Sequence, residues 1–176
     1  MKYIYLLALV QFYIGSSCQP QKNNDTNEMF HKAKAQAKKM ASSLINKDAD
    51  AFVGFHYPKM VEMMGGKQQA IASIEKSWKK QEEDSIKIIS DSIGNPSKII
   101  FYKGQYQCTI PQQMTMVIRN QKVAVESTIV AISMNDGETW YFIDAANDGF
   151  KKIKTYFPEI SEELEVPKQL PAKILK

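Results

Sequence analysis

The chain has 176 residues, of which 44% are hydrophobic and 24% are charged. That length suits one domain, and that balance is typical of a globular protein and excludes a disordered one. The net charge of +4 comes from scattered lysines, and Arg119 is the only arginine in the sequence. Because recognition of phosphates and bases relies on the planar arginine side chain, this composition argues against a nucleic-acid-binding protein.

The N-terminus has the features of an export signal. Lys2 supplies a positive start, an apolar run covers Tyr3–Ile14, and three small residues follow it. The run is too short for a transmembrane helix, which needs about 20 residues, and no later apolar run is long enough. We therefore predict a signal peptide over residues 1–17 and an exported protein.

Cys18 comes directly after Gly-Ser-Ser, which resembles the lipobox of bacterial lipoproteins, although Gly15 stands where leucine is usual. In that family, cleavage leaves a lipidated cysteine at the N-terminus. The resemblance implies a protein of the cell envelope, anchored through Cys18 to a membrane, with the outer membrane expected and ordinary secretion as the alternative. The polar, aperiodic residues 18–27 are predicted to form a flexible tether.

The remaining reactive residues are few. Cys108 is the only other cysteine, and it lies in a run typical of a strand, so we predict a buried structural thiol and not a nucleophile. With two histidines and no thiol cluster, the sequence predicts no metal site. The Gly65-Gly66 pair lacks the glycine spacing of phosphate-binding loops, so no cofactor is predicted.

The first half of the chain has helical periodicity. Apolar residues recur every three or four positions, and we predict helices over Glu28–Asn46, after Asp48, from Pro58 to Gly65, and over Lys67–Glu83. The methionines near Pro58 are predicted to fill gaps in the core, with a soft binding surface as the alternative.

After Asp84 the pattern changes to the alternation of a sheet. β-branched and aromatic residues predict strands over Ile86–Ile93, Ile99–Tyr102, Gln105–Ile118, Lys122–Met134 and Thr139–Asp144. Pro111, which cannot donate a backbone hydrogen bond, is expected at an edge or a bulge. A last helix is predicted over Asn147–Phe157, and residues 159–176 are predicted to be an extended C-terminal tail.

These elements predict an α+β fold with N-terminal helices packed on a bent antiparallel sheet of about five strands. The domain is expected to span residues 28–158. At this level the chain resembles the nuclear transport factor 2-like superfamily, the cone-shaped fold shared with ketosteroid isomerase and polyketide cyclases. It also resembles an uncharacterised group of exported Bacteroidetes proteins in the runs YPKMVEMMGGK, CTIPQQMTM and WYFID. The resemblance implies the fold and a weak tendency to form homodimers, but no single activity.

The run SMNDGETW, Ser133–Trp140, comes close to the Asp-box motif of sialidases. Asn135 replaces the usual aspartate, and Gly137 permits the turn conformation. A sialidase needs several such boxes and an arginine cluster, whereas this chain has one box and one arginine. The motif therefore predicts a hairpin and not a glycosidase.

The resemblance implies a pocket between the sheet and the helices. Asp144 and His56 are the candidates for acid–base chemistry there, although Asp144 could simply end a strand and His56 could bond a backbone carbonyl. Tyr106, Met114 and Trp140 are predicted to line a ligand surface. We expect a binding module for a small apolar ligand or an envelope protein, with an isomerase- or cyclase-like enzyme as the alternative. The enzyme requires Asp144 or His56 to point into a closed cavity.

Overall fold

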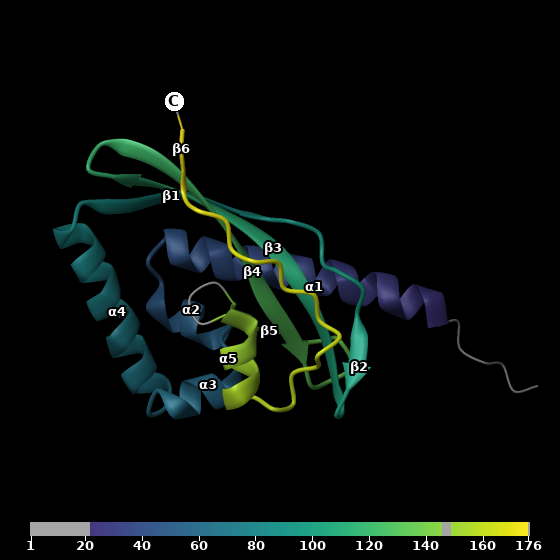
Figure 1. Ribbon diagram of the computed structural model, residues 1–176. Coiled ribbons are helices and arrows are strands. Elements are labelled where there is room, and N and C mark those ends of the chain that lie inside the picture. Colours follow the sequence, from purple (N-terminus) through teal and green to yellow (C-terminus); the bar gives the residue numbers. More distant parts are fainter. Residues whose placement is uncertain (1–21, 146–148, 176) are drawn as a thin grey trace, which may run out of the picture.

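The computed structural model describes residues 22–145 and 149–175. The predicted signal peptide, Cys18 and Asn147 lie outside these residues. The helices are α1 (Lys22–Ile45), α2 (Ala49–Gly54), α3 (Pro58–Met63), α4 (Lys67–Glu83) and α5 (Gly149–Tyr156). The strands are β1 (Ile86–Ile93), β2 (Ile100–Tyr102), β3 (Gln105–Ile118), β4 (Gln121–Ser133), β5 (Tyr141–Asp144) and β6 (Lys173–Ile174). The predicted α+β class, with helices first and an antiparallel sheet after them, is confirmed (Figure 1).

The long strands β3 and β4 form the centre of the sheet and pair from Tyr106↔Ser133 to Ile118↔Gln121. β1 and β2 pair one after the other with the outer side of β3, and β5 and β6 do the same along β4. Every one of these ladders is antiparallel, as the alternating sequence pattern and the short connections predict.

Pro111 lies where β1 ends beside β3. The Gly94 N–H donates to the Pro111 carbonyl at 2.8 Å, so the N–H that proline lacks would face this loop. Further along, the Ser97 N–H donates to the Thr109 carbonyl at 2.7 Å, and the Thr109 N–H donates to Ser97 Oγ at 2.9 Å. The loop thus continues the ladder from β1 to β2, which explains how a long central strand tolerates a proline.

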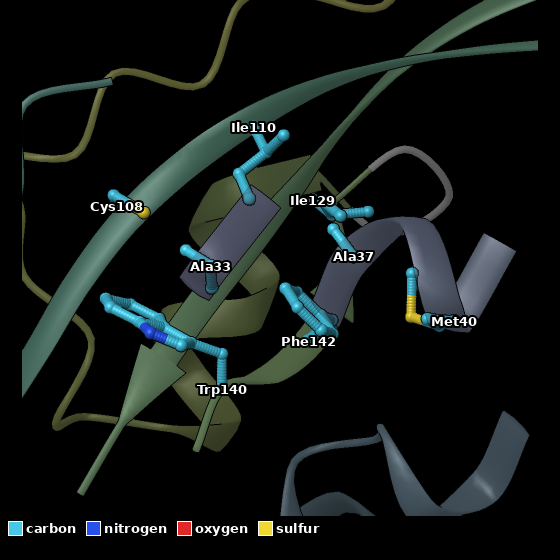
Figure 2. Close-up of a cluster of buried hydrophobic side chains, with 9 residues drawn as sticks. Ala33, Ala37, Met40, Cys108, Ile110, Ile129, Trp140 and Phe142 are labelled. Carbon is cyan, nitrogen blue, oxygen red and sulfur yellow. The ribbon is translucent and has the colours of Figure 1, made fainter. Parts of the chain in front are cut away.

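One face of the sheet packs against α1. The cluster consists of buried residues from α1 and three strands with their connecting turn: Ala33, Ala37, Met40, Cys108, Ile110, Ile129, Ala131, Trp140 and Phe142 (Figure 2). Ala33 and Ala37 are one helical turn apart and fully buried, so their small side chains let α1 approach the strands closely. Cys108 is buried as predicted, and burial raises the pKa of its thiol to about 12.

The opposite face is covered by α5, which corresponds to the helix predicted over Asn147–Phe157, and by the C-terminal segment, whose docking the sequence did not predict. Val130, Ile132 and Ile143 pack there against residues that follow β5, among them Ile153, Phe157, Ile160 and Leu164. In Figure 1 this yellow segment crosses the sheet on the side away from α1. The prediction of an extended tail over residues 159–176 is therefore wrong for its first part: residues 158–163 form turns, Ile160 and Leu164 belong to the core, and the chain runs without turns only from Leu164 onwards.

Two further features differ from the sequence prediction. α1 begins at Lys22 and not at Glu28, so residues 22–27, which were predicted as part of a flexible tether, are helical. Periodicity could not show this, because these six residues carry no apolar side chain. In α3 no residue is buried and Met63 is 59% exposed, so the prediction that its methionines fill the core is wrong for Met63. Only Met60 of this helix packs against the core on the outer face.

Candidate binding groove

The two predicted acid–base residues lie near each other at the α1 face of the sheet. His56 connects α2 to α3, and its Nδ1 lies 2.9 Å from the carbonyl oxygen of Phe52. Burial lowers the pKa of His56, while the Phe52 carbonyl and the Asp144 carboxylate raise it. Asp144 ends β5 and its side chain is exposed.

Asp91 joins this pair and was not predicted. Gln112 Nε2 donates to Asp91 Oδ2 at 2.7 Å, and Ser127 Oγ donates to Gln112 Oε1 at 3.2 Å. Asp91 Oδ1 is buried without a hydrogen-bond partner. Burial raises the pKa of Asp91 and the nearby Asp144 raises it further, while the Gln112 hydrogen bond lowers it.

This arrangement does not give an enclosed acid–base site. His56 is bonded to helix backbone and Asp144 is exposed, and neither side chain lines the large groove described below. General acid–base catalysis needs such groups within reach of a bound substrate in a site that excludes water. The positions of His56 and Asp144 match the structural roles that the sequence left as alternatives.

The predicted ligand-lining residues do not form one surface. Trp140 is fully buried in the cluster on the α1 face, and its Nε1 donates to the Gly137 carbonyl at 2.8 Å. The prediction that Trp140 lines a ligand surface is therefore corrected: this side chain closes the turn and fills the core. Tyr106 is half-buried beside the same cluster, whereas Met114 lies further along β3 and pairs with Asp91.

The Asp-box forms the tight hairpin that its sequence predicts. Ser133 Oγ accepts from the Gly137 N–H at 3.0 Å, and Asn135 Oδ1 accepts from the Thr139 N–H at 2.9 Å. Asn135 thus accepts a backbone hydrogen bond through its side-chain oxygen, as the usual aspartate can. Gly137 has φ 80°, a conformation that glycine adopts at little cost.

A groove of about 670 Å³ lies on the outer face of the sheet, beneath the C-terminal segment. Its floor consists of outward-facing residues of the two central strands, namely Thr109, Pro111, Gln113, Glu126 and Thr128. The loop after β1 forms one side and residues 165–170 form another. The groove exists because the apolar contacts of the C-terminal segment with the core end at Val166, and the next residues pass over polar strand positions.

The lining combines hydrogen-bonding and apolar groups. Hydroxyls and amides come from the strands and the loop after β1, while Val166, Pro167 and Leu170 contribute apolar surface from the C-terminal segment. Glu126, Glu165 and Lys168 are the charged lining residues. Such a surface can hold a ligand by apolar contact and orient it by hydrogen bonds.

A buried polar network ties the C-terminal segment to the sheet. The Tyr57 hydroxyl donates to Glu159 Oε1 at 2.7 Å and accepts from Gln105 Nε2 at 3.1 Å. Gln107 bonds the backbone of the same segment, donating to the Glu159 carbonyl at 2.7 Å and accepting from the Ser161 N–H at 2.9 Å. Lys59 Nζ lies 2.6 Å from Glu159 Oε1.

The ionisation states in this network follow from its contacts. Burial raises the pKa of Tyr57 to about 12, so its hydroxyl remains protonated and can donate. Burial also raises the pKa of Glu159, but the hydrogen bonds from Lys59 and Tyr57 outweigh it, and the net shift is downward. A charged Glu159 therefore holds the segment that borders the groove.

The sequence could have shown part of the polar floor, since Thr109 and Gln113 lie on the opposite face of β3 from apolar residues such as Ile110. It could not show the cover, because the decisive contact joins Tyr57 to Glu159, which are 102 positions apart.

The scan against family models gives no match, and neither a curated protein nor a solved structure matches this chain. Across residues 22–145 and 149–175, no cluster of three or more His, Cys, Asp or Glu side chains is placed to hold a metal ion. In the same ranges no helix is both long and apolar enough to cross a bilayer.

Proposed function

We propose that this protein is a binding module that holds a small amphipathic molecule in the groove beneath its C-terminal segment. The observation that carries this proposal is the groove itself, whose volume of about 670 Å³ falls within the usual range of ligand sites. The sequence favoured a ligand pocket between the sheet and the N-terminal helices, and the groove moves the proposal to the outer face of the sheet.

The chemistry of the lining narrows the ligand class. Hydroxyl and amide groups such as Thr109, Gln113 and Thr128 suit neutral hydrogen-bonding groups, and Val166 and Leu170 suit an apolar portion. Acidic and basic side chains are both present, so a strongly charged ligand is not favoured. The proposed ligand is therefore a neutral or zwitterionic molecule with an apolar part.

The proposed setting is the cell envelope. A lipidated Cys18, preceded by a cleaved signal peptide, would tether the domain to a membrane and keep the groove in the exported compartment. Membership of the nuclear transport factor 2-like superfamily, which the sequence resembles, is likewise a prediction.

Native mass spectrometry of the chain from Cys18 to Lys176, after exposure to an extract of its host's envelope, tests the groove. We expect a bound small molecule that is lost in a Gln113→Trp variant, because the indole fills the groove from an exposed floor position. Gln121→Trp places the same indole at an exposed position of β4 that does not line the groove and should retain the ligand. No adduct, or equal loss in both variants, contradicts the proposal.

Membrane fractionation of cells that produce the full chain tests the anchor separately. We expect the protein in the membrane fraction and a Cys18→Ser variant in the soluble fraction. Membrane retention of the Cys18→Ser variant would contradict lipidation without bearing on the groove.

A further inference from the structure

Two exposed apolar residues lie on neighbouring segments at the end of the sheet where β2 turns into β3. Phe101 is the most exposed large hydrophobic residue of the described chain, at 64%, and its ring centroid lies 4.8 Å from that of Tyr106. Met134, 46% exposed, follows Ser133, which pairs with Tyr106. Exposed apolar groups gathered at one place indicate an interaction surface.

α1 starts at this same end of the molecule. Met29 packs so tightly on the β4–β5 turn that a Cβ on Gly137 would lie 2.4 Å from Met29 Cγ. One turn further, Lys32 Nζ lies 2.6 Å from Glu138 Oε1. Figure 1 shows the N-terminal end of α1 and β2 at the same end of the sheet.

The chain outside the structure is short enough to bring a membrane to this end. Cys18 precedes Lys22 by four residues, which span at most roughly 14 Å when extended. From Lys22 to Met29 the helix rises about 10 Å, at 1.5 Å per residue. A lipid on Cys18 would therefore hold a bilayer at the end of the molecule that carries Phe101, and not at the β3–β4 turn at the opposite end.

Charge at this end is nearly balanced. Lys32 is paired with both Glu28 and Glu138, and Lys103 Nζ donates to the Pro158 carbonyl at 2.9 Å. Electrostatic attraction to anionic lipid is therefore weak, and apolar and aromatic side chains must supply the contact.

We propose that Phe101, Tyr106 and Met134 form a membrane-facing end that enters the interfacial layer of the bilayer that holds Cys18. This inference rests on the proposed lipid anchor. It also orients the groove: the groove floor begins at Thr109, three residues or about 10 Å along β3 from Tyr106, and reaches Gln113 at about 23 Å, so the groove lies on the side of Tyr106 away from the bilayer.

Tryptophan quenching tests the orientation. The chain from Cys18 to Lys176, which keeps every described residue, is coupled through Cys18 to a maleimide lipid in phosphatidylcholine vesicles with brominated acyl chains. Cys108 is 0% exposed and does not compete for coupling. The native Trp78 and Trp140 are 7% and 0% exposed and give a constant background. Phe101→Trp reports on the membrane-facing end, and Met63→Trp, at a 59% exposed site on α3, is the matched control.

We expect at least a twofold loss of the added tryptophan emission in the Phe101→Trp chain, and no loss in the Met63→Trp chain. A Met134→Trp chain should also be quenched, which guards against a local effect at Phe101. Equal quenching at Phe101 and Met63, or none at Phe101 and Met134, overturns the inference. Because chemical coupling replaces cellular lipidation here, this result is independent of the fractionation of Cys18→Ser.

Discussion

At the scale of single residues, the Tyr57 hydroxyl connects α3 and the sheet to the C-terminal segment. It is fully buried and bonds both Glu159 and Gln105. In Tyr57→Phe, Gln105 loses an acceptor and the Glu159 carboxylate loses a donor, so we expect a loss of about 1–2 kcal/mol in the free energy of unfolding. Urea denaturation measures it, with Tyr102→Phe, outside this network, as the control. A loss no larger than that of the control would show that the network contributes little.

Asp91 is a residue that destabilises the fold at neutral pH. Its folded-state pKa lies above the ordinary value of 3.8, so the folded protein holds this proton more tightly than the unfolded chain does. Stability therefore falls as pH rises from about 4 through the folded-state pKa.

We expect Asp91→Asn to raise the free energy of unfolding at pH 7 by roughly 0.5–1 kcal/mol, a figure discounted for partial solvent screening. The gain should shrink as the pH is lowered to 4, because the folded protein then binds the Asp91 proton, and it should vanish below the ordinary pKa of 3.8, where Asp91 is neutral in the unfolded chain as well. Denaturation at pH 4 and pH 7 measures it. Asp136→Asn removes the same charge at an exposed turn position and serves as the control. A gain at pH 4 equal to that at pH 7 would rule out the ionisation of Asp91 as its cause.

At the scale of elements, the Asp-box hairpin is where α1 packs closely against the sheet. Gly137 and Gly104 both have positive φ, 80° and 78°, but a Cβ on Gly137 would meet Met29 whereas one on Gly104 meets nothing within 4 Å. Alanine at either position strains the backbone by about 1–3 kcal/mol. Gly137→Ala should cost a further 1–3 kcal/mol or so from overpacking. Thermal unfolding of the two variants measures this difference. Equal losses of stability would mean that α1 shifts to accommodate the added methyl group at no cost.

Most elements could be predicted because their periodicity is local. The stripe of Ala33, Ala37 and Met40 and the alternation along β3 each require only neighbouring residues. The bulge in β1 could not be predicted, and it decides on which face of the sheet Asp91 lies. The register shifts between Ile88 and Ser90, which turns Asp91 to the face on which Ile88 lies.

At the scale of the whole molecule, the sequence predicted helices on one face of the sheet, whereas the structure has helices and further chain on both. The candidate site depends on the second cover, because the groove lies between the sheet and residues 165–170. That cover is set by contacts such as Ile160 and Leu164 against Val130 and Ile132, which join distant parts of the chain. Pro167 and Pro171 correctly indicated an extended segment, but composition alone does not tell a docked extended segment from a free one.

The first half of the C-terminal segment should therefore contribute mainly to stability, and the second half mainly to ligand binding. Leu164 is 4% exposed, so Leu164→Ala should lower the free energy of unfolding by about 2–4 kcal/mol. A chain that ends after Val166 lacks the exposed residues 167–174, which include the two-residue strand β6. This truncation should lower the free energy of unfolding by less than about 1 kcal/mol. The shortened chain loses Pro167–Leu170 from the groove, so it should fold but bind the envelope ligand weakly. Urea denaturation and native mass spectrometry of the same samples separate the two effects. A shortened chain that binds normally would show that the groove is not the binding site, because a folded domain would then have lost a wall of the groove without losing its ligand.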